Sequence, residues 1–227
     1  MTIDEHGVSV STVGGGVTTV TLNRPEKRNA LSIRVRDAVS DALDALAADE
    51  DVRCVVLTGV GDVFCAGFDL AEFRVEGDEF QRELWASSDR FHRTVLTFPL
   101  PIVASVNGPA LAGGFDLAVM CDLRVASRTA RFAHPEHEWS QVVYGPLEAL
   151  VGGAVARDLC FTGRAIDANE ALRLGLVSVV VEADELADET ARVSASIARA
   201  PRAALMTTKR KALSRAGIDP AAPTLDL

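Results

Sequence analysis

Two glycine-containing turns constrain what this chain can fold into and do. The first lies in residues 64–70 (FCAGFDL) after the apolar run 54–58, and the second lies in residues 107–117 (NGPALAGGFDL) after the apolar run 102–106. A segment with helical character follows each turn. Glycine lets a ligand approach the backbone closely, and a helix start leaves unpaired N–H groups at its positive end. Two such turns side by side would offer a pair of amide donors to a carbonyl oxygen that becomes negative during a reaction.

The composition fits one sizeable globular domain. The chain has 227 residues, of which 48% are hydrophobic and 24% are charged, and this is enough for a real core. The net charge of −9 disfavours nucleic-acid binding through a general basic surface, although a local cationic patch stays compatible with it. No apolar run approaches the ~18–20 residues that span a membrane. We also expect no secretory leader, because residues 1–6 lack a basic start and an apolar core.

The cysteines and the nucleotide-binding motifs narrow the chemistry further. The four cysteines are scattered in apolar settings and form no CxxC pair, which favours reduced, buried thiols in a cytoplasmic protein. The chain has no GxGxxG after a strand and no GxxxxGKS/T. Nicotinamide and ATP chemistry therefore have no support.

Hydrophobic periodicity predicts alternating strands and helices. Residues 8–13 and 17–22 read as a hairpin around three glycines, and Ser32 reads as the N-cap of a helix. The pattern also predicts strands at 52–58, 102–106 and 123–127, helices at 70–97 and 114–121, and a helical tail from about 183. Gly77 and Asp78 are a candidate interruption of the first of these helices. Residues 220–227 end the tail without a packed pattern.

Several segments in a fixed order carry a family resemblance. They are residues 22–31, 56–70, 107–122, 132–136, and 161–164 with 168–181. Through them the chain resembles the crotonase superfamily (enoyl-CoA hydratase/isomerase) over residues 8–212. The resemblance implies an α/β fold, a ClpP/crotonase-like spiral core of repeated strand–strand–helix units over residues 1–182. A C-terminal helical segment, 183–227, is expected to follow and is shorter than is usual in the family.

The resemblance also implies site residues. The backbone N–H groups of Phe68 and Gly113 would form an oxyanion hole, and Gly113 independently begins a predicted helix, so its amide is free. The alternative is that the glycines only permit tight packing. Asp116 and Glu136 occupy the two positions where hydratases of the family carry glutamates, which activate a water and deliver a proton to the α-carbon. The alternative for Glu136 is a solvated surface side chain.

Asp116 departs from the family pattern because it is one methylene shorter than Glu. A misplacement of about 1 Å can cost about 100-fold in rate. Its neighbours are apolar, so the acid lies in a helix expected to be buried, where a carboxylate without a role is costly. An internal cap or ion pair is the alternative. A one-base enolate reaction, such as a double-bond shift in an enoyl thioester, would survive the change better than two-acid hydration.

Coenzyme A is expected as part of the substrate, with no permanently bound cofactor. By resemblance it would contact Lys27, Arg28, Ala66, Asp69 and Leu70, with the two cations near phosphates. A solvated turn is the alternative for the cations. Residues 209–211 are a second candidate phosphate patch, with solvation as the alternative.

Aromatic and aliphatic side chains are expected around the acyl group. Helical spacing suggests an apolar face for it between residues 73 and 95. The predicted lining residues are Phe80, Leu84, Phe91, Trp139 and Tyr144. Core packing is the alternative for the last two rings.

A metal site is not expected. His134 and His137 flank Pro135 and Glu136, but no HExxH helix and no third clear ligand accompany them.

The sequence therefore predicts an enzyme that stabilises the enolate of an acyl-CoA thioester, as an enoyl-CoA hydratase or isomerase. Decarboxylation or hydrolysis of a CoA thioester would use the same oxyanion site. A non-catalytic acyl-CoA-binding or scaffold protein is the alternative from a different class. The resemblance implies a homotrimer or hexamer, with no nucleic-acid or membrane partner.

Overall fold

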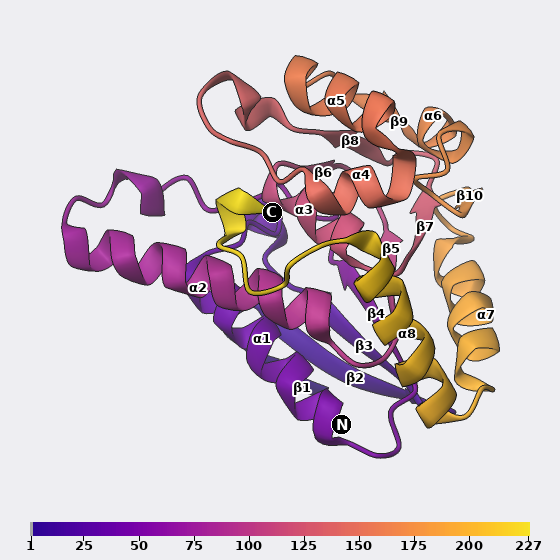
Figure 1. The fold of residues 1–227 in the computed structure, drawn as a ribbon. Coiled ribbons are helices and arrows are strands. Elements are labelled where there is room, and N and C mark those ends of the chain that lie inside the picture. Colours follow the sequence, from indigo (N-terminus) through magenta and orange to yellow (C-terminus); the bar gives the residue numbers. More distant parts are fainter. Residues whose placement is uncertain (1) are drawn as a thin grey trace.

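The computed structural model describes residues 2–227, and it consists of two sheets surrounded by helices (Figure 1). The larger sheet has the strand order β1-β2-β3-β4-β5-β7-β10, and the smaller sheet has the order β6-β8-β9. The strands are β1 Thr2–Glu5, β2 Val8–Gly14, β3 Val17–Leu22, β4 Cys54–Gly59, β5 Ile102–Val106, β6 Ala110–Leu111, β7 Leu123–Ser127, β8 Arg131–Ala133, β9 Ile166–Asp167 and β10 Val179–Val181.

Helices connect and cover these strands. The α-helices are α1 Ile33–Ala48, α2 Asp78–Thr97, α3 Gly113–Met120, α4 Gly145–Val151, α5 Gly153–Thr162, α6 Ala168–Arg173, α7 Leu186–Ala198 and α8 Arg202–Ala216. Four short 3₁₀ helices among the described residues are η1 Pro25–Lys27, η2 Glu72–Arg74, η3 Pro135–Glu138 and η4 Thr224–Asp226.

The large sheet changes from antiparallel to parallel at β3. β1, β2 and β3 pair antiparallel, and the hairpin between β2 and β3 confirms the prediction around the glycines. From β3 onward every neighbouring pair is parallel. β4 and β5, in the middle of this parallel part, are mostly apolar and buried, as expected where both faces of a sheet are covered.

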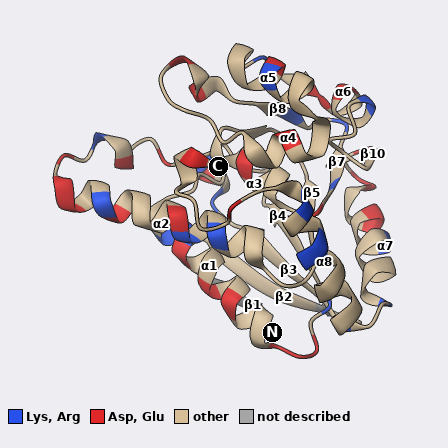
Figure 2. Cartoon of the chain, viewed as in Figure 1, with Lys and Arg blue, Asp and Glu red and all other residues tan. Residues whose placement is uncertain are grey.

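Helices lie on both faces of this sheet. α1, α2 and α3 cover the face that holds the main core, while α7 packs on the other face against β3, β4, β5 and β7. In Figure 2 the central strands are almost entirely tan, and the charged residues lie mainly on peripheral helices and loops. Ser32 caps α1 as predicted, because its hydroxyl accepts a hydrogen bond from the Val35 amide.

The chain winds as a spiral whose turns repeat the predicted strand–strand–helix unit. Each turn adds a strand to the large sheet, then a short strand or bridge, then a helix. The units are β4, a bridge at Cys65 and α2; then β5, β6 and α3; then β7, β8 and α4. The short strands follow the C-terminal ends of the large-sheet strands, so the two glycine turns meet there.

The helix predicted over 70–97 is interrupted at the expected place, Gly77, and its first part is not α-helical. The helix starts only at Asp78, because Gly77 has a φ of 121°, which breaks helical geometry. Asp78 and Glu79 then lie in the first turn, where the helix dipole favours acidic side chains. Residues before Gly77 form η2 and a loop instead.

The tail after α8 was expected to be unpacked, and this is wrong. The Thr224 hydroxyl lies 2.9 Å from the Ser88 hydroxyl, and its backbone amide donates to Asp89 Oδ1 at 2.8 Å. Thr224 and Leu227 are both buried. The tail therefore lies across α2, as Figure 1 shows in yellow.

All four cysteines are free and buried, as predicted. Across residues 2–227, no helix combines the length and apolar character needed to cross a membrane.

Candidate active site

The two glycine turns are in direct contact. A Cβ placed on Gly67 would lie 2.8 Å from the Ala112 Cβ and 3.1 Å from the Gly113 backbone nitrogen. A Cβ placed on Gly113 would lie 3.7 Å from the Phe68 backbone nitrogen. Within the described chain, neither the Phe68 amide nor the Gly113 amide donates a backbone hydrogen bond. Two unpaired N–H groups thus lie next to each other, which is the arrangement that a developing oxyanion requires.

Backbone conformation brings these amides together. Gly67 has a φ of 92°, and Ala112, the residue before α3, has a φ of 51° and a ψ of −131°. A non-glycine residue in that region is strained, and such strain clusters at functional sites. Gly114 is needed for a different reason, since a Cβ there would lie 2.2 Å from the Cys65 carbonyl oxygen.

A buried arginine supports the first turn, and the sequence interpretation missed it. Arg36 on α1 is buried, and its guanidinium carbon lies 4.5 Å from the centre of the Phe68 ring. The guanidinium donates to the Leu31 carbonyl at 2.7 Å, and Leu31 forms a β-bridge with Phe68. Burial lowers the pKa of Arg36 to about 10, partly offset by the charge of Glu72. The sequence did contain a signal for this role, because Arg36 occupies a position on the apolar face of an amphipathic helix.

The turns open into a cavity of about 140 Å³. Ala66, Phe68 and Gly113 line it from the two turns, and Asp116 and Glu136 line it from α3 and η3. Its remaining wall is mainly apolar and includes Phe73, Trp85, Trp139, Val143 and Leu225.

The structure corrects most of the predicted acyl-pocket residues. Trp139 lines the cavity, but Leu84 and Phe91 lie fully buried in the core. Phe80 and Tyr144 also lie outside the lining, and the Tyr144 hydroxyl donates to Glu148 Oε1 at 3.1 Å. Helical spacing identified the buried face of α2, and that face points to the protein core. Phe73 and Trp85 line the cavity instead, and their rings lie edge to face, with centroids 6.1 Å apart.

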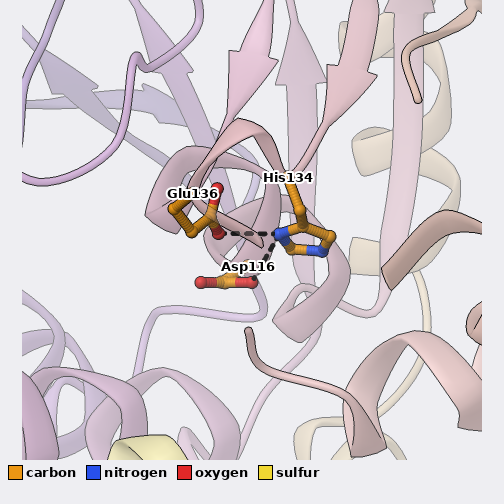
Figure 3. A group of neighbouring side chains, drawn as sticks. All are labelled: Asp116, His134 and Glu136. Carbon is orange, nitrogen blue, oxygen red and sulfur yellow. Dashed lines mark hydrogen bonds and ion pairs between the residues drawn. The ribbon is translucent and has the colours of Figure 1, made fainter. Parts of the chain in front are cut away.

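The two acids predicted from sequence lie together, with a histidine beside them. His134 Nδ1 is 3.0 Å from Glu136 Oε1 and 3.7 Å from Asp116 Oδ1 (Figure 3). All three side chains are buried. Asp116 projects from the first turn of α3, while His134 and Glu136 come from the end of β8 and from η3. The alternative of a solvated Glu136 is therefore wrong.

Burial perturbs the titration of this cluster. Burial raises the pKa of Asp116 to about 7; His134 opposes this rise, and the charge of Glu136 adds to it. Burial by itself would lower the pKa of His134, but the hydrogen bond to Glu136 and the two carboxylate charges together raise it above its ordinary value. Asp116 therefore keeps its proton to near-neutral pH, which suits a group that must donate one.

We expect Asp116→Asn to stabilise the fold at pH 8 and to have little effect at pH 4. In the unfolded chain an Asp ionises near pH 3.9, whereas native Asp116 holds its proton up to about pH 7. Between these values the unfolded chain binds fewer protons, so the free energy of unfolding of the unsubstituted protein falls as pH rises. The difference amounts to up to about 4 kcal/mol.

Urea unfolding at both pH values measures this difference. The exposed Asp62 provides a matched control, because Asp62→Asn removes a solvated carboxylate. A gain for Asp116→Asn that is equal at the two pH values would contradict the raised pKa.

Asp116, His134 and Glu136 are also the candidate ligands for a metal ion. Each offers one ligand-type atom, and these atoms lie within 4.8 Å of one another. The sequence interpretation found no third such group, because Asp116 lies far along the chain from His134. In the structure the His134 Nδ1 is already hydrogen-bonded to Glu136, which accounts for the contact without an ion. That the protein uses no metal stays a prediction.

The structure places only some of the residues predicted to contact coenzyme A in the wall of the cavity. Ala66 and Leu70 line it, and Leu70 is exposed. Lys27 and Arg28 are exposed and lie outside this lining, although the Ala66 amide donates to the Arg28 carbonyl at 3.0 Å and so holds Arg28 beside the first turn. Asp69 has a structural contact, an ion pair with Arg24 at 3.5 Å.

Lys209 does not belong to a phosphate patch. It is buried, and its ammonium donates to Asp122 Oδ2 at 2.8 Å and to the Leu100 carbonyl at 3.0 Å. It therefore ties α8 to the start of β5.

Comparisons with known proteins agree with this fold and site. The family model described as enoyl-CoA hydratase/isomerase matches residues 12–223. A putative enoyl-CoA hydratase from Thermus thermophilus is 40% identical over 90% of this chain and 83% of its own length. A short-chain-enoyl-CoA hydratase from Clostridium acetobutylicum is 36% identical over 81% of this chain and 72% of its own length.

Solved structures are similar along nearly the whole chain. The crystal structure of an enoyl-CoA hydratase from Mycobacterium smegmatis superposes with a TM-score of 0.87 at 37% identity, covering 95% of this chain and 85% of that one. An enoyl-CoA hydratase from Bacillus anthracis has a TM-score of 0.88 at 30% identity, covering 94% and 85%.

The fold is therefore that of the crotonases, and the protein is an enzyme of the enoyl-CoA hydratase/isomerase type. The chain belongs to the enoyl-CoA hydratase/isomerase family.

Proposed function

We propose that the protein hydrates short-chain enoyl-CoA thioesters at the cavity between the two glycine turns. The observation that carries the proposal is the placement of Asp116 and Glu136 in the wall of the cavity that Phe68 and Gly113 also line. The thioester oxygen would accept hydrogen bonds from these amides. A negative charge developing there is stabilised by donors already in position and by the N-terminus of α3.

Hydration needs one protein group that takes a proton from water and a second that gives a proton to the substrate. At neutral pH the cluster can supply both, because Asp116 retains a proton that an ordinary carboxyl has lost. Of the two acids, the one that is ionised takes a proton from water while the water oxygen bonds to the β-carbon of the substrate. The proton that the other acid already holds passes to the α-carbon. Asp116 and Glu136 therefore share one proton after the reaction, as they did before it.

The size of the cavity supports a short acyl group. Its volume of about 140 Å³ is below the range of about 300–1,000 Å³ typical of ligand pockets. The pantetheine arm would leave past Ala66 and Leu70, and the phosphates would lie near Lys27 and Arg28. Cytoplasmic location stays a prediction from the cysteines, and a homotrimer or hexamer stays a prediction from the resemblance.

Crotonyl-CoA tests this proposal. We expect its ultraviolet absorbance to fall as water adds across the double bond, and calorimetric titration to give binding that weakens as salt rises, because exposed phosphate contacts are screened. Binding without turnover would favour the non-catalytic alternative. No binding of crotonyl-CoA or of free coenzyme A at millimolar concentration would refute the acyl-CoA site.

Isomerisation is the second candidate, and the short side chain of Asp116 favours it. A single base could move a proton between the α- and γ-carbons while the same amides hold the enolate. A 3-enoyl-CoA substrate distinguishes the two reactions, because isomerisation increases the absorbance of the conjugated thioester and hydration of crotonyl-CoA decreases it.

A further inference from the structure

We propose that His134 is a positioning residue that holds the Glu136 carboxylate in its reactive orientation. This inference rests on the proposed hydration. His134 is buried with 1% of its surface exposed, and it does not line the cavity, whereas Glu136 does. His134 is therefore separated from the cavity and can affect the reaction only through the Glu136 carboxylate.

The direction of the hydrogen bond follows from chemistry. As the base in the proposed hydration, Glu136 acts as a carboxylate that only accepts, so the proton between His134 Nδ1 and Glu136 Oε1 belongs to the imidazole. This bond uses Oε1 of Glu136. Oε2 is buried and has no hydrogen-bond partner among the described residues. The bond thus fixes one oxygen and leaves the other to take a proton from a bound water.

The imidazole is itself held in place. Its ring packs on Phe115 of α3, with ring centroids 4.7 Å apart, and its backbone carbonyl accepts from the His137 amide at 3.2 Å. The ring is therefore fixed between β8 and α3. A donor fixed in this way restricts the Glu136 side chain more than a flexible one would, and reactivity depends on such positioning.

His134 Nδ1 lies close to both acids, Asp116 and Glu136. Asp116 Oδ1 lies 3.7 Å from Nδ1, beyond a hydrogen bond but in direct electrostatic reach. Glu136 and Asp116 are thus gathered around one imidazole nitrogen, although they come from elements far apart in sequence. This arrangement keeps the shorter Asp116 side chain beside Glu136.

The test compares three substitutions with crotonyl-CoA as substrate. His134→Phe removes the donor and keeps a ring, and we expect kcat to fall about 100-fold with KM unchanged. His134→Asn should recover most of kcat, because its amide nitrogen lies as many bonds from the backbone as Nδ1. His134→Gln places its amide one bond farther out and should resemble His134→Phe.

A double-substitution cycle with Glu136→Gln separates positioning from a general structural effect. If His134 acts through Glu136, adding His134→Phe to Glu136→Gln should cost little more. Losses that multiply, or three single variants with equal kcat, would overturn the inference while leaving the hydration intact. Activity lost on chelation and restored by a divalent cation would assign the cluster to a metal and also overturn it. An unsubstituted protein that fails to hydrate crotonyl-CoA would refute the proposed function itself.

Discussion

Glu136→Gln is expected to lower kcat for crotonyl-CoA hydration by about 10³-fold, because the substitution removes a group that transfers a proton in the transition state. The side chain keeps its length, and its amide oxygen can still accept the hydrogen bond from His134 Nδ1, which now spans 3.0 Å. The fold and the binding of coenzyme A should therefore survive. Steady-state kinetics together with calorimetric binding of crotonyl-CoA measure the effect.

The neighbouring Glu138 provides the control for this substitution. It lies on the same 3₁₀ helix but is exposed and outside the cavity lining. Glu138→Gln makes the same chemical change and should leave kcat unaltered. Full hydratase activity in a folded Glu136→Gln variant would remove Glu136 from the mechanism.

Gly113→Pro should lower kcat by about 10²–10³-fold, corresponding to a loss of about 3 kcal/mol of transition-state stabilisation. Proline lacks the N–H group that is proposed to hold the thioester oxygen. Gly113 is the first residue of α3, a position at which proline is well tolerated in helices. Ala112 before it, however, has a φ of 51° and a ψ of −131°, outside the extended region that a residue before proline prefers. Urea unfolding therefore accompanies steady-state kinetics, and the loss in kcat is measured on a folded variant.

Gly113→Ala separates the donor from the added bulk. The alanine keeps the amide but introduces a Cβ that would lie 2.9 Å from Cδ1 of Phe68, so the ring must shift to admit it. The difference in kcat between the Pro and Ala variants then reports the missing donor. Equal kcat in the two variants would argue against an oxyanion role for this amide.

Local patterns in the sequence were sufficient for much of the fold. Period-two alternation identified the β2–β3 hairpin, and the serine before an amphipathic run identified the start of α1. These features depend on interactions between residues close in sequence, so they can be predicted from it. The helix predicted over 70–97 is also a local case: the interruption expected at Gly77 is present, and residues 70–76 before it do not join α2.

The sequence by itself determined the two glycine turns, the pair of acids and the family. Only the tertiary structure decided what surrounds them. Asp116 and Glu136 meet at one imidazole nitrogen because α3 and the end of β8 lie side by side, and Arg36 reaches the Phe68 ring from α1. The cavity beside the two acids is lined by Phe73 and Trp85 rather than by Leu84 and Phe91. Periodicity shows which face of a helix is apolar, but whether that face meets the core or a cavity depends on elements distant in sequence that pack against it.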